Sequence, residues 1–179
     1  YSYQAVRDRV NEREYNIVRH AGVLFALFQL YASTRDPRYL EAATRGVNFL
    51  KSRFRPFDGG RGVYVLDNDG KAKLGAAGLT VLALTNQIEL DSKRGNLSQA
   101  KQVAQFILSM QGADGSFRSY YRLRGDEPAG SVSLYYPGEA ILGLVALYRI
   151  TAEPRLIDAA RKGADYLIDY QRKMRELPQ

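Results

Sequence analysis

The sequence predicts an all-α protein built from three repeated αα-hairpins. First, "TRDPRYLEAATRGVNFLKSR" (34–53) recurs as "TAEPRLIDAARKGADYLIDY" (151–170), and a weaker copy, "LSQAKQVAQFILSMQ" (97–111), lies between them. Second, a more apolar segment precedes each copy, at 22–34, 77–90 and 139–151. An apolar segment followed by an amphipathic one, repeated at intervals, is typical of stacked helical hairpins.

The first hairpin is expected at about 15–54. Its first helix is apolar on nearly every side, which predicts burial on most sides. In its second helix Leu40, Ala43, Val47 and Leu50 form one stripe at helical spacing. Asp36 is expected at or near the N-cap, and Pro37 fits the first helical position, where a missing N–H costs nothing.

The second and third hairpins are expected at about 74–111 and 137–172. Asn96 is a plausible N-cap for the second amphipathic helix, and Glu153 followed by Pro154 repeats the Asp–Pro start of the first. Tyr31, Tyr148 and Phe49 lie at helical spacing inside the repeats and are expected in the core. Together the hairpins form one domain over residues 1–179.

Two long connections, 55–72 and 112–134, separate the hairpins. Short stretches in them, such as "GVYVL", are expected to pair as small β-hairpins around an "NDG" turn. Each connection joins an amphipathic helix to the next apolar helix. The connections and the starts of the apolar helices therefore gather at one end of the fold, and connections this long are more often functional than idle.

Composition excludes several kinds of site. The 179 residues contain no cysteine and one histidine, which excludes disulfides, thiolate metal sites and a cysteine nucleophile. We expect no metal site and no cofactor. The net charge of +7 favours anionic partners, but the basic residues are scattered and no nucleic-acid-binding module is recognised. No apolar run reaches the length of a membrane span, and no signal-peptide pattern is retained, so a soluble chain is expected.

The chain resembles the α/α-toroid (six-hairpin glycosidase-like) superfamily. The resemblance is carried by "DPRYLEAA" (36–43) and "EPRLIDAA" (153–160), by "SMQGADGSF" (109–117) and by "YYPGEA" (135–140). It implies part of an (α/α) toroid, or otherwise a short α-solenoid. A full ring in that superfamily has six or seven hairpins, so the resemblance also implies a further chain segment or subunit that completes the ring.

Candidate site residues lie where the apolar helices begin. Aromatic faces stack on sugar rings, and amide, guanidinium and carboxyl groups hold hydroxyls or carboxylates. The predicted catalytic residues are His20, Glu139 and Tyr136. The predicted substrate-binding residues are Tyr15, Asn16, Arg19, Lys73, Asp114 and Tyr135. Packing explains His20 equally well, a helix-dipole role explains Glu139, and a turn explains Asp114, as it does Asp58, Asp67 and Asp69.

Three functions remain open at this point. The first is a carbohydrate-active domain that binds or acts on an oligo- or polysaccharide, acidic ones included, as a hydrolase or a uronate lyase or epimerase. A hydrolase needs two carboxylates roughly 5 to 9.5 Å apart, and no such pair stands out in the sequence. The alternative is a non-catalytic helical repeat domain that binds a glycan or a protein. The third is a scaffold that assembles with its own kind.

Overall fold

The computed structural model describes residues 2–11, 15–91, 97–122 and 133–175, and in these ranges the fold is all-α with small strands at its edge. The helices are α1 (Ile17–Thr34), α2 (Pro37–Ser52), α3 (Leu74–Leu90), α4 (Leu97–Ser109), α5 (Tyr136–Thr151) and α6 (Pro154–Arg175). The strands are β1 (Ser2–Gln4), β2 (Arg9–Asn11), β3 (Phe54–Phe57), β4 (Gly62–Val65), β5 (Lys71–Lys73) and β6 (Tyr120–Arg122). The predicted three αα-hairpins are confirmed.

The helix boundaries follow the local chemistry that the repeats indicated. Asp36 caps α2 by accepting a hydrogen bond from the backbone N–H of Arg38, and Pro37 is the first helical residue. Between the paired helices, Arg35 and Ala152 both adopt left-handed backbone conformations, with φ of 58° and 52°. The first and third hairpins therefore turn in the same way. The predicted cap Asn96 lies outside the described residues.

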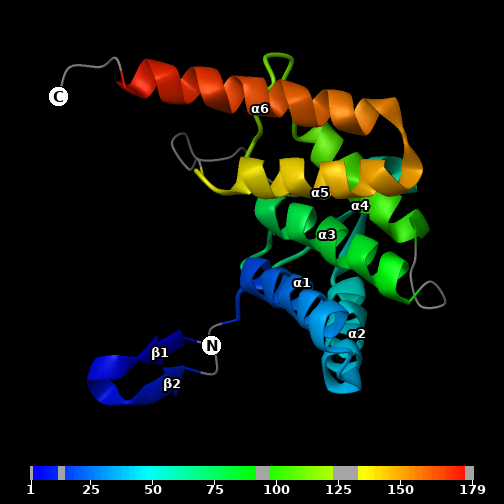
Figure 1. Ribbon diagram of the computed structural model, residues 1–179. Coiled ribbons are helices and arrows are strands. Elements are labelled where there is room, and N and C mark those ends of the chain that lie inside the picture. Colours follow the sequence, from blue (N-terminus) through cyan, green and yellow to red (C-terminus); the bar gives the residue numbers. More distant parts are fainter. Residues whose placement is uncertain (1, 12–14, 92–96, 123–132, 176–179) are drawn as a thin grey trace.

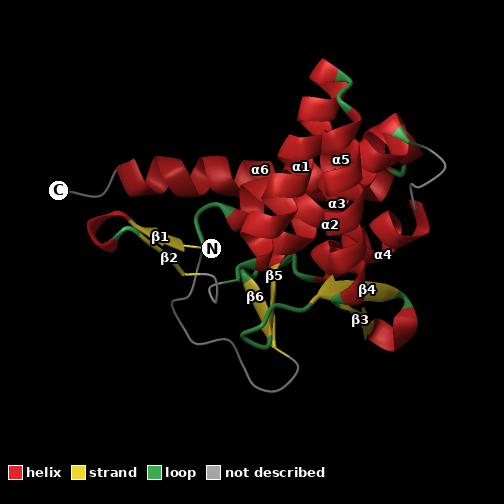
Figure 2. Ribbon diagram, turned by 90° about the horizontal axis from the view of Figure 1, so that it is seen from below, coloured by secondary structure: helices red, strands yellow, loops and turns green. Residues whose placement is uncertain are grey.

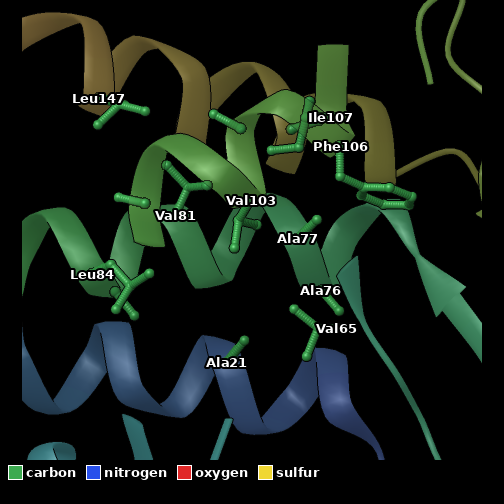
Figure 3. Packing of buried hydrophobic residues seen from close by; sticks show 14 of the residues in the cluster. Ala21, Val65, Ala76, Ala77, Val81, Leu84, Val103, Phe106, Ile107 and Leu147 are labelled. Carbon is green, nitrogen blue, oxygen red and sulfur yellow. The ribbon is translucent and has the colours of Figure 1, made fainter. Parts of the chain in front are cut away.

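The first helices of the hairpins form an inner layer with α3 at its centre (Figure 1). Figure 3 shows Ala77, Val81 and Leu84 of α3 between Ala21 of α1 and Leu147 of α5. The amphipathic helices α2, α4 and α6 pack outside their partners. Their predicted apolar stripes are buried, as Ala43, Val47 and Leu50 of α2 show.

Burial of the inner helices on most sides holds only for α3, which is buried along nearly its whole length. On α1 the side chain of Val23 is 56% exposed, and on α5 that of Leu142 is 48% exposed. The expectation is wrong for these two helices because each has an inner-helix neighbour on one side only. An apolar stripe is therefore open at both edges of the hairpin stack.

Glycines bring α3 and α5 into backbone contact. A Cβ on Gly143 would lie 2.5 Å from the carbonyl oxygen of Gly78, and a Cβ on Gly78 would overlap the backbone of Glu139. Real Cβ atoms essentially never approach so closely. We call this contact the glycine seam, and it fixes α5 against α3.

Within the described ranges three two-stranded antiparallel sheets accompany the helices, and β3 to β6 lie along one side of the helical body (Figure 2). The strand in "GVYVL" is β4, and it pairs with β3 through the turn at 58–60 rather than around the "NDG" turn. The "NDG" turn is flanked by an isolated β-bridge between Leu66 and Ala72. β5 and β6 come from the two different long connections and pair with each other. The β1–β2 hairpin near the N-terminus was not predicted.

No helix in the described ranges has the length and apolarity that crossing a membrane requires.

Candidate functional site

The starts of α1, α3 and α5 lie at one end of the fold, which we call the mouth (Figure 1). The β5–β6 pair connects the starts of α3 and α5. The backbone N–H of Leu74 donates to the carbonyl oxygen of Ser119, and the Ser119 hydroxyl accepts from the backbone N–H of Ser133. The Ser133 hydroxyl accepts in turn from the backbone N–H of Tyr136. This hydrogen-bonded chain positions the first turn of α5.

Four side chains from both connections and from α5 lie together at the mouth. The Tyr120 and Tyr136 rings meet edge to face with centroids 5.7 Å apart, and Lys73 is the ladder partner of Tyr120. Glu139 lies one turn after Tyr136, on the same face of α5. We call Lys73, Tyr120, Tyr136 and Glu139 the α5 cluster.

Glu139 packs against α3 at a position where the chain has no side chain. The Glu139 carboxylate and the Tyr136 ring occupy the space that a Cβ on Gly75 would need. Its Oε2 atom is buried and has no hydrogen-bond partner among the described residues. Burial raises the pKa of the Glu139 carboxyl. The carboxyl thus keeps its proton to a higher pH than an exposed glutamate and can donate a hydrogen bond.

Burial also raises the pKa of the Tyr136 phenol, to about 12, with a smaller contribution from Tyr120. At neutral pH Tyr136 is therefore a hydroxyl donor rather than a base. The phenol of Tyr136 is thus polar and uncharged at neutral pH, and the carboxyl of Glu139 takes up a proton more readily than an exposed glutamate.

Lys73 is held in an ion-pair network with two aspartates. Its Nζ lies 2.5 Å from Oδ2 of Asp67 and 3.1 Å from Oδ2 of Asp69. Asp67 is only 3% exposed and also accepts a hydrogen bond from the backbone N–H of Asn68. Asp67 and Asp69 were expected as turn residues. They do shape the turn, but Asp67 also anchors Lys73 at the mouth.

His20 lies in a separate group on the first hairpin. Its Nε2 is 3.1 Å from the carbonyl oxygen of Gly46 on α2, and its ring stacks on Phe49 with centroids 5.2 Å apart. Tyr15 meets both rings edge to face, and we call Tyr15, His20 and Phe49 the histidine group. Because a carbonyl oxygen only accepts, Nε2 carries the hydrogen of neutral His20 and Nδ1 is the basic nitrogen. Burial lowers the pKa of His20, so the ring is neutral at pH 7.

The repeat explains the surroundings of His20. Gly46 is covered by Leu24 and His20, and the equivalent Gly163 of the third hairpin is covered by Ile141 and Phe117. His20 thus fills a place that an aromatic side chain fills in the other copy. Phe49 was expected in the core but is 44% exposed, because it packs on the outer side of His20.

Tyr15 links the histidine group to the α5 cluster electrostatically. Its hydroxyl is buried without a hydrogen-bond partner among the described residues. Its pKa is raised to about 12, mainly by burial and further by the negative charge of Asp67. Asp67 therefore raises the pKa of Tyr15 at the first hairpin and forms an ion pair with Lys73 at the start of the second.

The other predicted site residues are spread more widely. Asn16 caps α1 by accepting a hydrogen bond from the backbone N–H of Arg19, whose side chain is exposed. Tyr135 is also exposed at the start of α5. Asp114 lies outside the mouth, in the turn that packs against α6. The structure therefore brings together Lys73, Tyr136 and Glu139 and leaves His20 and Asp114 apart from them.

Sequence reasoning missed Tyr120, Ser119 and Ser133. Tyr120 lies in the aromatic run 120–121, which carried a signal for a strand but none for its partner. The two serines gave no signal beyond polarity. The residues that the structure describes contain no group of three histidine, cysteine, aspartate or glutamate side chains that could hold a metal ion.

The sequence matches no family model and no curated protein significantly. The structure, however, is similar to several solved enzymes. The GH76A α-1,6-mannanase of Salegentibacter sp. HEL1_6 matches with a TM-score of 0.74 and 18% identity over 89% of this chain and 49% of that chain. Cellobiose 2-epimerase from Bacillus thermoamylovorans B4167 matches with a TM-score of 0.70 and 17% identity over 89% of this chain and 46% of that chain.

A sugar epimerase from a ruminal bacterium matches with a TM-score of 0.68 and 16% identity over 98% of this chain and 48% of that chain. All three proteins are α/α toroids. The chain has the α/α-toroid fold. It spans about half the length of the solved structures it matches, as three hairpins of a six-hairpin ring would.

Proposed function

We propose that the chain is a carbohydrate-active domain that holds an oligosaccharide at the mouth. The observation that carries the proposal is Glu139, a half-buried carboxyl whose pKa burial raises and whose Oε2 has no partner among the described residues, next to two tyrosines and a lysine. A protonated carboxyl and phenol hydroxyls donate hydrogen bonds to sugar oxygens, and aromatic rings pack on the apolar faces of sugars.

The similar solved structures support the same ligand class. They include a mannanase, two epimerases and a mannose isomerase, and an inactive mannanase variant was solved with α-1,6-mannotriose. In that variant two consecutive aspartates are replaced. The present sequence contains no two consecutive aspartates. A carboxylate of these three hairpins that takes part in hydrolysis is therefore not one of such a pair.

In the catalytic form of the proposal Glu139 is the general acid and Tyr136 donates a hydrogen bond to the substrate. A general acid works best when its pKa lies near the operating pH, and the burial of Glu139 moves its pKa in that direction. For a uronate lyase or epimerase, Nδ1 of His20 is the base that the first hairpin offers. Lys73, Arg19 and Asn16 then contribute substrate contacts, together with Tyr15 and Tyr135.

The non-catalytic alternative has its own observation. Lys73 is neutralised by two aspartates, and His20 is engaged by the backbone of α2. Side chains that are held by internal ion pairs and hydrogen bonds in this way are suited to fixing the shape of a binding surface, and less suited to transferring protons. In this form the mouth binds a glycan without changing it.

Turnover and binding distinguish the two forms. The chain is incubated with α-1,6-mannotriose, cellobiose and an oligogalacturonate, products are followed by chromatography, and binding is followed by NMR shifts at the mouth. We expect Glu139→Gln and Tyr136→Phe to weaken binding, and Glu139→Gln to abolish any turnover. The control is Glu89→Gln, at the exposed far end of α3.

Binding without turnover that Glu139→Gln weakens supports the non-catalytic form. If all three saccharides leave the mouth resonances unmoved, or if Glu89→Gln has the same effect as Glu139→Gln, the proposal is wrong.

We further propose that three more hairpins, from a further chain segment or a second subunit, complete the ring and the mouth. The open apolar stripes of α1 and α5 are the edges that such hairpins would cover, and the half-length match to the solved toroids supports their number. Light scattering of the chain alone, with Val23→Lys and Leu142→Lys as variants, tests the second-subunit form. A dimer that both variants dissociate is expected for that form, and a monomer excludes it.

A further inference from the structure

A groove lies outside the mouth, between the turn at 112–116 and the second half of α6. It encloses a cavity of about 470 Å³. Its lining includes Asp114, Asp165, Tyr166, Asp169, Tyr170 and Lys173. None of these residues belongs to the α5 cluster or to the histidine group. The groove is therefore a separate surface on the outer layer of the fold.

The turn that forms one wall is firmly attached to α6. Gly115 has a φ of 89°, and its lack of a side chain lets it approach the backbone carbonyl of Lys162. The side-chain amide of Gln111 donates to the carbonyl oxygens of Gly115 and Ala159, which joins the turn to the helix. The wall is thus formed before any ligand arrives.

Asp114 is fixed inside this turn. Its Oδ1 accepts hydrogen bonds from the backbone N–H of Ser116 at 3.0 Å and from the Ser116 hydroxyl at 2.7 Å. These bonds hold the pKa of the Asp114 carboxyl below its usual range, so the group is a charged acceptor at neutral pH. One wall of the groove therefore presents an oriented hydrogen-bond acceptor.

The opposite wall is an aromatic pair. Tyr166 and Tyr170 lie one turn apart on α6, and their rings are nearly parallel, with an interplanar angle of 17° and centroids 6.4 Å apart. Tyr170 is 42% exposed. Parallel tyrosine rings offer a flat apolar surface with hydroxyls at its edge, which suits the alternating apolar faces and hydroxyls of a sugar.

The charges of the groove favour a neutral ligand. Its lining contains three aspartates and two lysines, so the lining attracts neither polyanions nor polycations strongly. Among the described residues Asp165 and Lys173 form no ion pair, and both remain available for hydroxyl groups. Carboxylates accept from hydroxyls and ammonium groups donate to them, which is the pairing that a neutral saccharide requires.

We propose that this groove is a second saccharide-binding site, separate from the mouth and specific for neutral oligosaccharides. Tyr166 and Tyr170 form its stacking platform, and Asp114 and Asp165 accept hydrogen bonds from sugar hydroxyls. The proposal shares its ligand class with the proposed function but does not depend on activity at the mouth.

The test uses the whole chain, with resonances of α6 and of the 112–116 turn followed by NMR during titration with α-1,6-mannotriose, cellobiose and an oligogalacturonate. We expect shifts in the groove with at least one neutral saccharide and none with the acidic one. Loss of one aromatic contact in Tyr170→Ala should weaken groove binding about fivefold. The matched control is Ile168→Ala, an exposed residue on α6 outside the groove lining, which should leave the affinity unchanged.

Mouth and groove are separated by cross-testing. Tyr136→Phe should leave groove shifts intact, and Tyr170→Ala should leave mouth shifts intact. If the unmodified chain shows shifts in the groove but none at the mouth, the proposed function is refuted and the groove proposal stands. The groove proposal is overturned if no neutral saccharide shifts the groove resonances, if Tyr170→Ala binds as tightly as the unmodified chain, or if the oligogalacturonate binds there better than the neutral sugars.

Discussion

The glycine seam allows a matched pair of substitutions on one helix. Gly143 and Gly138 both lie in α5, but a Cβ on Gly143 would be 2.5 Å from the carbonyl oxygen of Gly78, whereas a Cβ on Gly138 meets nothing within 4 Å. Gly143→Ala and Gly138→Ala therefore add the same methyl group to the same helix. Only the first forces α5 away from α3.

The magnitude follows from the geometry. Ordinary contacts of a Cβ begin at 3.4 Å, so the helices must separate by roughly 1 Å to accept alanine at position 143. Overpacking of this kind costs about 1–3 kcal/mol. Replacing glycine by alanine in a helix contributes up to about 1 kcal/mol in the opposite direction, and Gly138→Ala receives that gain without the cost.

We therefore expect Gly143→Ala to be less stable than Gly138→Ala by about 2 kcal/mol. For a chain of this size such a difference lowers Tm by about 4–8 °C. Urea denaturation and thermal melting followed by circular dichroism measure both quantities. Equal stability of the two variants, or a Gly143→Ala protein more stable than the parent chain, would refute the seam as a close backbone contact.

Three further predictions concern the mouth and the histidine group. Burial raises the pKa of Glu139 above its unfolded value. The stability that the protonated carboxyl contributes is therefore complete below about pH 4.5 and is lost as the pH rises through the folded pKa. Glu139→Gln should remove this loss, which urea denaturation at pH 4 and pH 7 measures. Burial lowers the pKa of His20, so the free energy of unfolding should fall as the pH drops below about 6.5. His20→Phe keeps an aromatic ring against Phe49 and should abolish this pH dependence between pH 5 and pH 8. Lys73→Met leaves Asp67 buried without its ion-pair partner and should lower the free energy of unfolding by about 3 kcal/mol. The double variant Lys73→Met with Asp67→Asn should recover most of this loss when both are measured by urea denaturation.

The fold was predictable because its signals are local and repeated. Asp36 caps α2 and Pro37 is its first residue, and Pro154 is likewise the first residue of α6, so the helix starts can be located without tertiary information. The β5–β6 pairing was not predictable in this way. Its strands are three residues each and come from connections far apart in the sequence, and nothing in either strand specifies its partner.

The site was predictable in residue type but only partly in arrangement. Tyr136 and Glu139 could be placed at the mouth because the register of the repeat positions the start of α5. The register could not show that His20 points toward Gly46 on its own hairpin, because rotamer choice depends on packing. The burial of Asp67 was also missed, since an Asp–Asn–Asp–Gly sequence indicates a turn irrespective of what packs against it.

The β5–β6 ladder makes the mouth a late product of assembly. The two helices of a hairpin meet through contacts close in sequence, but Lys73 precedes the second hairpin and Tyr120 follows it, so their pairing closes a loop around that whole hairpin. A saccharide held by both side chains would bind the chain with these two strands paired and not with them apart. Mass action then requires that such a ligand protect the β5–β6 pairing from local opening, and amide hydrogen exchange in β5 and β6 would slow as its occupancy rises.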